Sequence, residues 1–193
     1  MSGRKQFDEA SILDCAMRQF WEKGYTATSL ADLEMATGLN KSSIYNTFKS
    51  KEGLYARCIE RFRTEYTRGA LAKLDHPDFK TALSRFFDVL LAGFDDPSCP
   101  NGCIATMGAL EMGDKNNIVS GLISNGLEEM LVYIEQRCLK AIEDKQLDAK
   151  MDCSELAAMI LAVTRGVVVL NMGTGNANTG RKAYDCVLSF ISL

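Results

Sequence analysis

The stretch TGLNKSSIYNTFKSKEGL, residues 37–54, contains the pattern that decides the fold of this chain. Three apolar residues, Leu39, Ile44 and Phe48, predict a short helix over 41–48 with one buried face. The other positions of that helix carry many small or polar side chains, namely Lys41, Ser42, Ser43, Asn46 and Thr47. A helix that only packs a core does not need so many hydrogen-bonding groups on one face, whereas a helix that lies in a groove of DNA does.

A second short helix is predicted directly before this one, over 29–37. Ser29 with Asp32 three residues later resembles a capping box, and Gly38 suits the position just after the last helical residue. Two helices joined by a short turn that contains a glycine form a helix-turn-helix. In that arrangement the first helix crosses the phosphate backbone and the second enters the major groove of DNA.

The rest of the chain also has helical patterns, which predicts an all-α fold, since the period-two alternation of strands is nearly absent. About nine helices are predicted, over 7–23, 29–37, 41–48, 51–74, 79–94, 103–112, 118–144, 153–171 and 181–191. Asn40, Ser50 and Asp152 are the predicted N-caps of three of them. We predict two domains, a three-helix helix-turn-helix domain at 1–50 and a helical bundle at 51–193, connected by the helix that begins near residue 51.

Charge and composition agree with a small DNA-binding module on a larger acidic body. The chain has 193 residues, of which 47% are apolar, and a net charge of −3. Residues 1–63 hold ten Lys or Arg against eight Asp or Glu, so the basic excess lies in the first third. No apolar run reaches the roughly 18 residues of a membrane span, and no signal-peptide pattern is present, so we expect a cytoplasmic protein without a membrane partner. Its seven cysteines should then be reduced thiols.

Residues 16–55, AMRQFWEKGYTATSLADLEMATGLNKSSIYNTFKSKEGLY, resemble the N-terminal domain of the TetR-type transcriptional repressors. The residues that match the family pattern in register are Ala16, Phe20, Gly24, Tyr25, Thr28, Ser29, Gly38, Leu39, Tyr45, Phe48, Lys51, Glu52 and Leu54. The chain departs from the pattern at Glu34, where the family favours Ala. The resemblance implies a one-component repressor of transcription with a divergent helical ligand-binding domain, and neither an enzyme nor a cofactor-binding protein.

The resemblance also implies which residues contact double-stranded operator DNA. The hydroxyl of Tyr45 would bind a backbone phosphate, and Thr28 and Lys51 match phosphate-binding positions at helix N-termini, where free N–H groups favour an anion. Asn46 can pair with an adenine edge. The full predicted DNA-binding set is Thr28, Ser29, Lys41, Ser42, Ser43, Tyr45, Asn46, Thr47 and Lys51, with Arg4 and Lys5 as a basic arm.

The helix predicted over 153–171 is apolar nearly all round, with LAAMILAV and VVVL in its sequence. Such a helix must be buried on more than one side. One side can face its own domain, and we expect the other, with the helix over 181–191 beside it, to face a second copy in a homodimer. The alternative is a central core helix in a monomer. A dimer would place two recognition helices about 34–36 Å apart on a near-palindromic operator.

An effector-binding cavity is expected within the bundle, for an unknown small apolar or electrophilic molecule. The candidate lining residues are Phe62, Tyr66, Phe87, Leu90, Cys103, Met107, Leu110, Met130, Tyr133 and Met159, because Met and aromatic side chains adapt to apolar ligands. For any single one of them, ordinary core is the better interpretation. Arg165 and Asn171 are the polar residues that fit least well in a buried helix, and each would meet either a ligand or an interface partner.

Two cysteines, Cys99 and Cys103, begin and end the sequence CPNGC. They are the basis of the main alternative functions. Within the subgroup that the chain resembles, a cysteine at Cys103 can sense oxidants or electrophiles, whereas the simpler interpretation is a small buried thiol. The spacing of Cys99 and Cys103 is not that of a metal site, and we expect no metal and no catalytic residue. The alternative functions are a cytosolic helical redox protein or enzyme that uses Cys99 and Cys103, and a ligand-binding dimer that has lost its DNA contacts.

Overall fold

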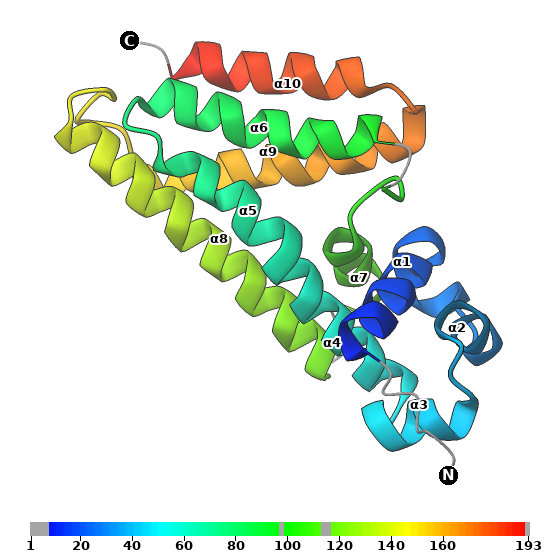
Figure 1. Ribbon diagram of the computed structural model, residues 1–193. Helices are drawn as coiled ribbons and strands as arrows, with labels where there is room; N and C mark the ends of the chain where they lie inside the picture. The colour runs from blue at the N-terminus through cyan, green and yellow to red at the C-terminus, as the bar shows by residue number, and fades with distance from the viewer. Residues whose placement is uncertain (1–7, 97–98, 113–116, 192–193) are drawn as a thin grey trace.

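The computed structural model describes residues 8–96, 99–112 and 117–191, and every regular element in these ranges is helical (Figure 1). The α-helices are α1 (Glu9–Ala27), α2 (Leu30–Thr37), α3 (Lys41–Phe48), α4 (Lys51–Phe62), α5 (Arg68–Leu71), α6 (Phe79–Asp95), α7 (Ile104–Met112), α8 (Ile118–Glu143), α9 (Cys153–Thr174) and α10 (Ala177–Phe190). A π-helical turn, η1 (Arg63–Thr67), joins α4 to α5, and a 3₁₀ turn, η2 (Ala72–Asp75), follows α5. The all-α prediction is confirmed.

The predicted helix caps are present. The Ser29 side chain accepts from the Asp32 N–H while the Asp32 carboxylate accepts from the Ser29 N–H, which completes the capping box of α2. Asn40 and Ser50 cap α3 and α4 without a reciprocal bond, each accepting from the N–H three residues on. Gly38 ends α2 in the left-handed conformation, with φ of 69°. These caps fix both ends of the turn between α2 and α3.

Several helices differ from their predicted bounds. The helix predicted over 7–23 extends to Ala27 across a break at Gly24, and the helix predicted over 153–171 extends to Thr174. The last helix, predicted over 181–191, already begins at Ala177 within the sequence GTGNANTG, because the Asn176 side chain caps it by accepting from the Asn178 N–H. Gly180 is buried inside this helix, where an added Cβ would lie 2.6 Å from Val167 Cγ1. The glycine therefore allows α10 to pack closely on α9, and its role is close approach rather than chain flexibility.

The helix predicted over 51–74 is continuous but not uniform. Its middle is the π-helical turn η1, and its last turn is the 3₁₀ segment η2. Single π-turns within α-helices often mark functional sites, because they shift the faces of the helix on either side. Here the turn separates the part that packs on the first three helices from the part that packs on the bundle.

The buried side chains form two adjoining cores. The first holds α1, α2 and α3 together with α4, α7 and the start of α8. The second is built by α5, α6, α9, α10 and the remainder of α8. In Figure 1 the long helix α8 runs alongside both groups. Buried residues of α4 such as Leu54, Tyr55 and Phe62 belong to the first core, so packing continues across residue 50, the predicted domain boundary.

Among the described helices, α9 is the one whose length and mean hydropathy would suit a membrane span. In the structure, 44% of its most apolar stretch is buried inside the molecule, where α9 packs against α6, α8 and α10. That burial is what a core helix of a bundle requires. Its remaining face is exposed and carries apolar and small side chains, which matters for the predicted homodimer.

Candidate nucleic-acid interface and ligand cavity

The helix α3 presents one buried and one exposed face. Ile44 and Phe48 are buried in the first core, as the spacing predicted. On the opposite side Lys41, Ser42, Tyr45, Asn46 and Thr47 are all exposed. Ser43 is half-buried, and its N–H donates to the Asn40 side chain at 2.8 Å. The structure thus brings together the central part of the predicted DNA-binding set on a single surface.

One lysine extends this surface at the end of α3, and a second begins α4. Lys49 is exposed and was missed in the sequence analysis; its Nζ donates to the Asn46 carbonyl at 3.0 Å. Its φ of 70° ends the helix, so its side chain stays beside the exposed face. Lys51 is half-buried, with its Nζ 4.3 Å from the centroid of the Tyr25 ring, and burial lowers the pKa of its ammonium group. A lysine directly after a predicted recognition helix was the available signal for Lys49.

Thr28 does not share the exposed surface. Its side chain is only 1% exposed, and its hydroxyl donates to the Gly24 carbonyl at 2.6 Å. The hydroxyl is therefore committed to closing the turn after Gly24, whose φ of 80° breaks α1. Ser29, the next residue, is exposed, and its hydroxyl donates to the Asp32 carboxylate. The predicted arm at Arg4 and Lys5 lies outside the described residues.

Glu34, the departure from the family pattern, has a local role. Its Oε1 accepts a 2.5 Å hydrogen bond from the backbone N–H of Lys41, the first residue of α3. A carboxylate at this end of a helix is favoured by the helix dipole. The contact ties α2 to α3 and so fixes the angle between the two helices. It also places a negative charge beside the proposed DNA-facing surface.

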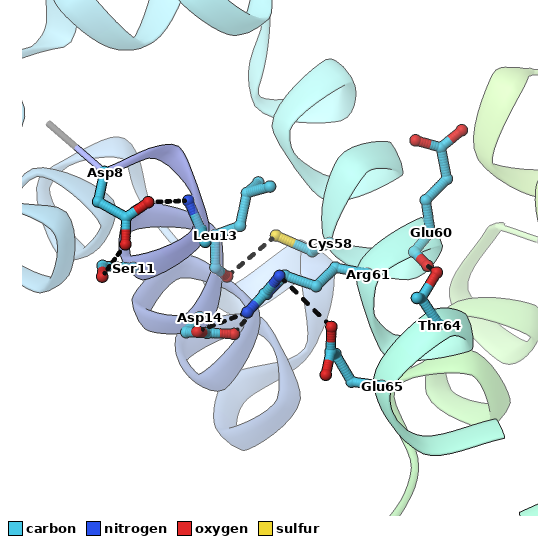
Figure 2. Close-up of polar contacts among 10 residues, drawn as sticks. Asp8, Ser11, Leu13, Asp14, Cys58, Glu60, Arg61, Thr64 and Glu65 are labelled. Carbon is cyan, nitrogen blue, oxygen red and sulfur yellow. Dashed lines mark hydrogen bonds and ion pairs between the residues drawn. The ribbon is translucent and has the colours of Figure 1, made fainter. Parts of the chain in front are cut away.

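Polar side chains join α1 to α4 and to the start of η1, as Figure 2 shows. The Arg61 guanidinium makes two hydrogen bonds to the Asp14 carboxylate, from Nε at 2.5 Å and from Nη2 at 2.8 Å. Bidentate Arg–carboxylate pairs of this kind fix orientation as well as distance. Because α4 continues through η1 into the bundle, movement of η1 would be passed to α1 through this pair.

A cavity of about 130 Å³ lies beside η1, between α1, α6 and α9. Five predicted lining residues meet there, and they are Phe62, Tyr66, Leu90, Cys103 and Met130. The structure adds Trp21 from α1 and Arg165 from α9. Trp21 was missed because its place in the apolar stripe of α1 indicated an ordinary core residue. The walls are mainly apolar, as expected for a small-molecule site.

The other predicted lining residues lie elsewhere, because neighbouring helices turn them away from this cavity. Phe87 packs in the second core, with its ring stacked on Tyr184 at a centroid distance of 4.0 Å. Leu110 is exposed on α7. The Tyr133 hydroxyl donates to Asp75 at 2.7 Å in a surface groove, and burial together with this hydrogen bond raises the pKa of Tyr133 to about 12. Met107 and Met159 are half-buried outside the cavity lining.

The seven cysteines are all free thiols. Cys103 is buried in the cavity wall, and the Arg165 Nη1 lies 3.6 Å from its sulfur. Cys99 is half-buried, with its sulfur 3.8 Å from an Asp96 carboxylate oxygen. Within the described ranges no group of three or more His, Cys, Asp or Glu side chains is placed to hold a metal ion.

A helix-turn-helix with an exposed polar recognition face, mounted on a helical bundle that borders an apolar cavity, defines a DNA-binding regulator of transcription. The family model for bacterial regulatory proteins of the tetR family matches residues 12–58. The model for the tetracyclin repressor-like C-terminal domain matches residues 80–186, which is more than half of the chain. The chain belongs to the tetR family.

Individual relatives agree over most of the length. The HTH-type transcriptional repressor ComR of Escherichia coli is 28% identical over 171 residues, which cover 86% of this chain and 80% of ComR. A cysteine mutant of the TetR family regulator CifR, solved in complex with a 26-base-pair operator, superposes with a TM-score of 0.87 at 26% identity, covering 96% and 97% of the two chains. A TetR transcriptional regulator from Chloroflexus aurantiacus superposes with a TM-score of 0.83 at 26% identity, and the match covers 93% of this chain and 91% of that one. Family membership disfavours the enzyme alternative.

Proposed function

We propose that this protein is a cytoplasmic repressor that binds a near-palindromic double-stranded operator as a homodimer. Residues 1–50 would hold the DNA, and residues 51–193 would bind an effector and the second copy. The observation that carries the proposal is the exposed polar face of α3 on its buried anchors Ile44 and Phe48. The names of ComR, a repressor, and of CifR, solved with its operator, support it.

The exposed side chains suggest separate roles on the duplex. Tyr45 and Lys41 lie on one edge of α3, with the Lys41 Nζ 6.0 Å from the Tyr45 ring centroid, and would bind phosphates. Asn46 is suited to an adenine edge in the major groove. Ser42, Ser43 and Thr47 are small enough to let the helix backbone approach the bases. Ser29 and Lys51 stand at the N-terminal ends of α2 and α4, where an anion is favoured.

The first prediction tests these roles with DNA from the region upstream of the gene that encodes this protein. Asn46→Ala should weaken operator binding by roughly 5- to 150-fold, because one base contact is worth about 1–3 kcal/mol, and should relax specificity at one position in each half-site. Lys41→Gln should weaken binding to all sequences alike and make the salt dependence shallower. Gel shifts and fluorescence anisotropy at several salt concentrations measure both effects.

The matched control is Lys150→Gln, because Lys150 is an exposed lysine between α8 and α9, away from α3. It should bind the operator as the wild type does. A wild-type protein that ignores its upstream DNA at low salt would instead support a ligand-binding dimer without DNA contacts. Normal operator binding by both Asn46→Ala and Lys41→Gln would show that α3 does not contact the DNA.

The effector is proposed to act through the cavity beside η1. A ligand shifts a two-state equilibrium only by its difference in affinity for the two states, and a change from 1:99 to 99:1 needs about 5.5 kcal/mol. Phe62 at the end of α4 and Tyr66 in η1 both line the cavity. A ligand that fits better with α4 displaced would therefore move α1 through the Arg61–Asp14 pair and change the distance between the two recognition helices.

Cys103 offers a second route to release, through thiol modification. An electrophile that alkylates the thiol would form a thioether and add volume inside the 130 Å³ cavity. We expect N-ethylmaleimide to abolish operator binding by the wild type and by Cys99→Ser, but not by Cys103→Ser, in gel shifts after matched incubation. Equal loss in Cys103→Ser would place the effect at another cysteine and reject this route.

A further inference from the structure

We propose that the effector is a small carboxylate with an apolar body about the size of one aromatic ring, bound with its carboxylate on Arg165. This inference rests on the proposed ligand-responsive function and names the chemical class that the cavity would take. It follows from the Arg165 guanidinium, which has no carboxylate partner, from the Trp21 indole N–H, which has no acceptor, and from the size of the cavity that both residues line.

Arg165 brings a positive charge into the cavity without a negative partner. Its Nη1 lies 3.4 Å from Thr106 Oγ1 and 3.6 Å from Cys103 Sγ, and its Nη2 lies 3.8 Å from Met130 Sδ. These are weak, uncharged acceptors, and Nε is buried with no acceptor at all. No ion pair joins Arg165 to any Asp or Glu of the described ranges. Arg165 is half-buried, and charges withdrawn from water are normally paired, so this guanidinium favours an anion from outside the chain.

The direction of the Arg165 side chain argues against a partner in a second copy. The three atoms that it contacts belong to Cys103 at the start of α7, to Thr106 in α7 and to Met130 in α8 of the same chain. It lines the cavity and a second pocket between α4 and α8. It also borders a more open pocket that includes Gly166 and Val169 of the exposed face of α9. The guanidinium thus points into its own domain, toward the cavity.

Trp21 supplies the second orphan donor. Its side chain is 7% exposed and lines the same cavity, and its indole Nε1 is buried without an acceptor. The ring contacts Phe62 and Tyr66 edge-on, at centroid distances of 5.0 Å and 5.4 Å. Arginine and indole N–H groups only donate hydrogen bonds, while an ionised carboxylate only accepts them. The two residues therefore select for a ligand with acceptors and negative charge.

The dimensions limit the rest of the ligand. The cavity measures about 130 Å³, and an engineered apolar cavity of about 150 Å³ holds one benzene molecule. Side chains such as Leu90, Phe94 and Val168 provide apolar walls. A monocyclic aromatic acid or a short branched aliphatic acid would bury its body there, with its charge at Arg165. The π-turn η1 forms part of the wall, so the occupied site adjoins the helix that leads to α1.

The test uses Trp21, the only tryptophan of the chain, as its reporter. The full-length protein without DNA is titrated with benzoate and, separately, with benzyl alcohol, the uncharged analogue of similar size, while Trp21 emission is followed. We expect benzoate to bind at least tenfold more tightly. Arg165→Met should remove this preference and leave benzyl alcohol binding within threefold of the wild type. Arg165→Lys, which keeps the charge, should bind benzoate with intermediate affinity.

Arg68→Met is the matched control, because Arg68 is an exposed arginine of α5 outside the cavity lining, and it should behave as the wild type. Thermal unfolding monitors the fold of each variant. Equal binding of benzoate and benzyl alcohol by the wild type, no response to benzoate at millimolar concentration, or an unchanged preference in a folded Arg165→Met would each overturn the inference. Operator binding is measured separately without benzoate. Normal operator binding with no benzoate response would defeat only the ligand class, whereas benzoate binding without operator binding would defeat only the proposed repressor function.

Discussion

A variant with aspartate at both Val169 and Leu170 is expected to be a monomer and to bind the operator roughly 10²- to 10⁴-fold more weakly than the wild type, because it can engage one half-site at a time. These two side chains are 50% and 45% exposed on the outer face of α9. If a second copy covers that face, four aspartates would be buried close together in the dimer. Burying unpaired charges of one sign costs far more than the apolar contacts provide.

The outer face of α9 supports this prediction along its length. Small or apolar residues recur on it at helical spacing and are all exposed, namely Ala158, Ala162, Gly166, Val169, Leu170 and Gly173. Phe190 near the end of α10 is also exposed. Small residues allow two helices to approach closely, and an exposed apolar patch of this kind is typical of a protein interface. These are the two helices that the sequence pattern predicts for the homodimer, and their exposed face fits that proposal.

The matched control carries aspartates at Val132 and Leu139 of α8, which are 56% and 42% exposed, nearly the same as the pair on α9. It adds the same charge on a different face and should remain a dimer with normal operator affinity. Light scattering coupled to size-exclusion chromatography gives the mass, and anisotropy gives the affinity. A Val169→Asp, Leu170→Asp protein that remains dimeric would move the interface away from α9.

The helix-turn-helix could be predicted from the sequence because its determinants are local. Ser29, Asn40 and Ser50 cap helices within three residues, and Gly38 supplies a left-handed residue at a fixed place. The buried positions Ile44 and Phe48 follow directly from helical spacing. For the same reason the sequence alone predicts which face of α3 is exposed. Short-range rules determine this part of the molecule almost completely.

The cavity could be predicted only in part, because its position depends on how distant helices pack. The apolar pattern of α6 places both Phe87 and Leu90 inward, yet only Leu90 reaches the cavity. Nothing in the sequence indicates that Trp21 of α1 meets residues of α6 and α9. The unusual position of Arg165 was recognisable, but whether it turns inward or toward a second copy depends on the rotation of α9. The π-turn η1 has no clear local signal either.

Phe87→Ala tests the distinction between core and cavity directly. Phe87 is fully buried and stacks on Tyr184 with an angle of 6° between the rings. Truncating a buried phenylalanine to alanine costs about 3–5 kcal/mol through lost contacts and the space that remains. A domain of ordinary stability has about 5–15 kcal/mol in total, so the loss should be large in urea unfolding. By contrast, Leu90→Ala removes a half-buried side chain from the cavity wall and should cost less.

Val89→Ala is the control for stability on the same helix, since the Val89 side chain is 38% exposed and should change the free energy of unfolding little. Val89 also lines the cavity, so Arg68→Met remains the control for benzoate binding. The variants should also separate in the titration with benzoate: Leu90→Ala enlarges the cavity and should alter benzoate affinity, whereas Phe87→Ala, where it stays folded, should not. The opposite pattern, a stable Phe87→Ala protein with altered benzoate binding, would place Phe87 in the ligand site and contradict its assignment to the second core. The two measurements together therefore decide which side of α6 faces the ligand.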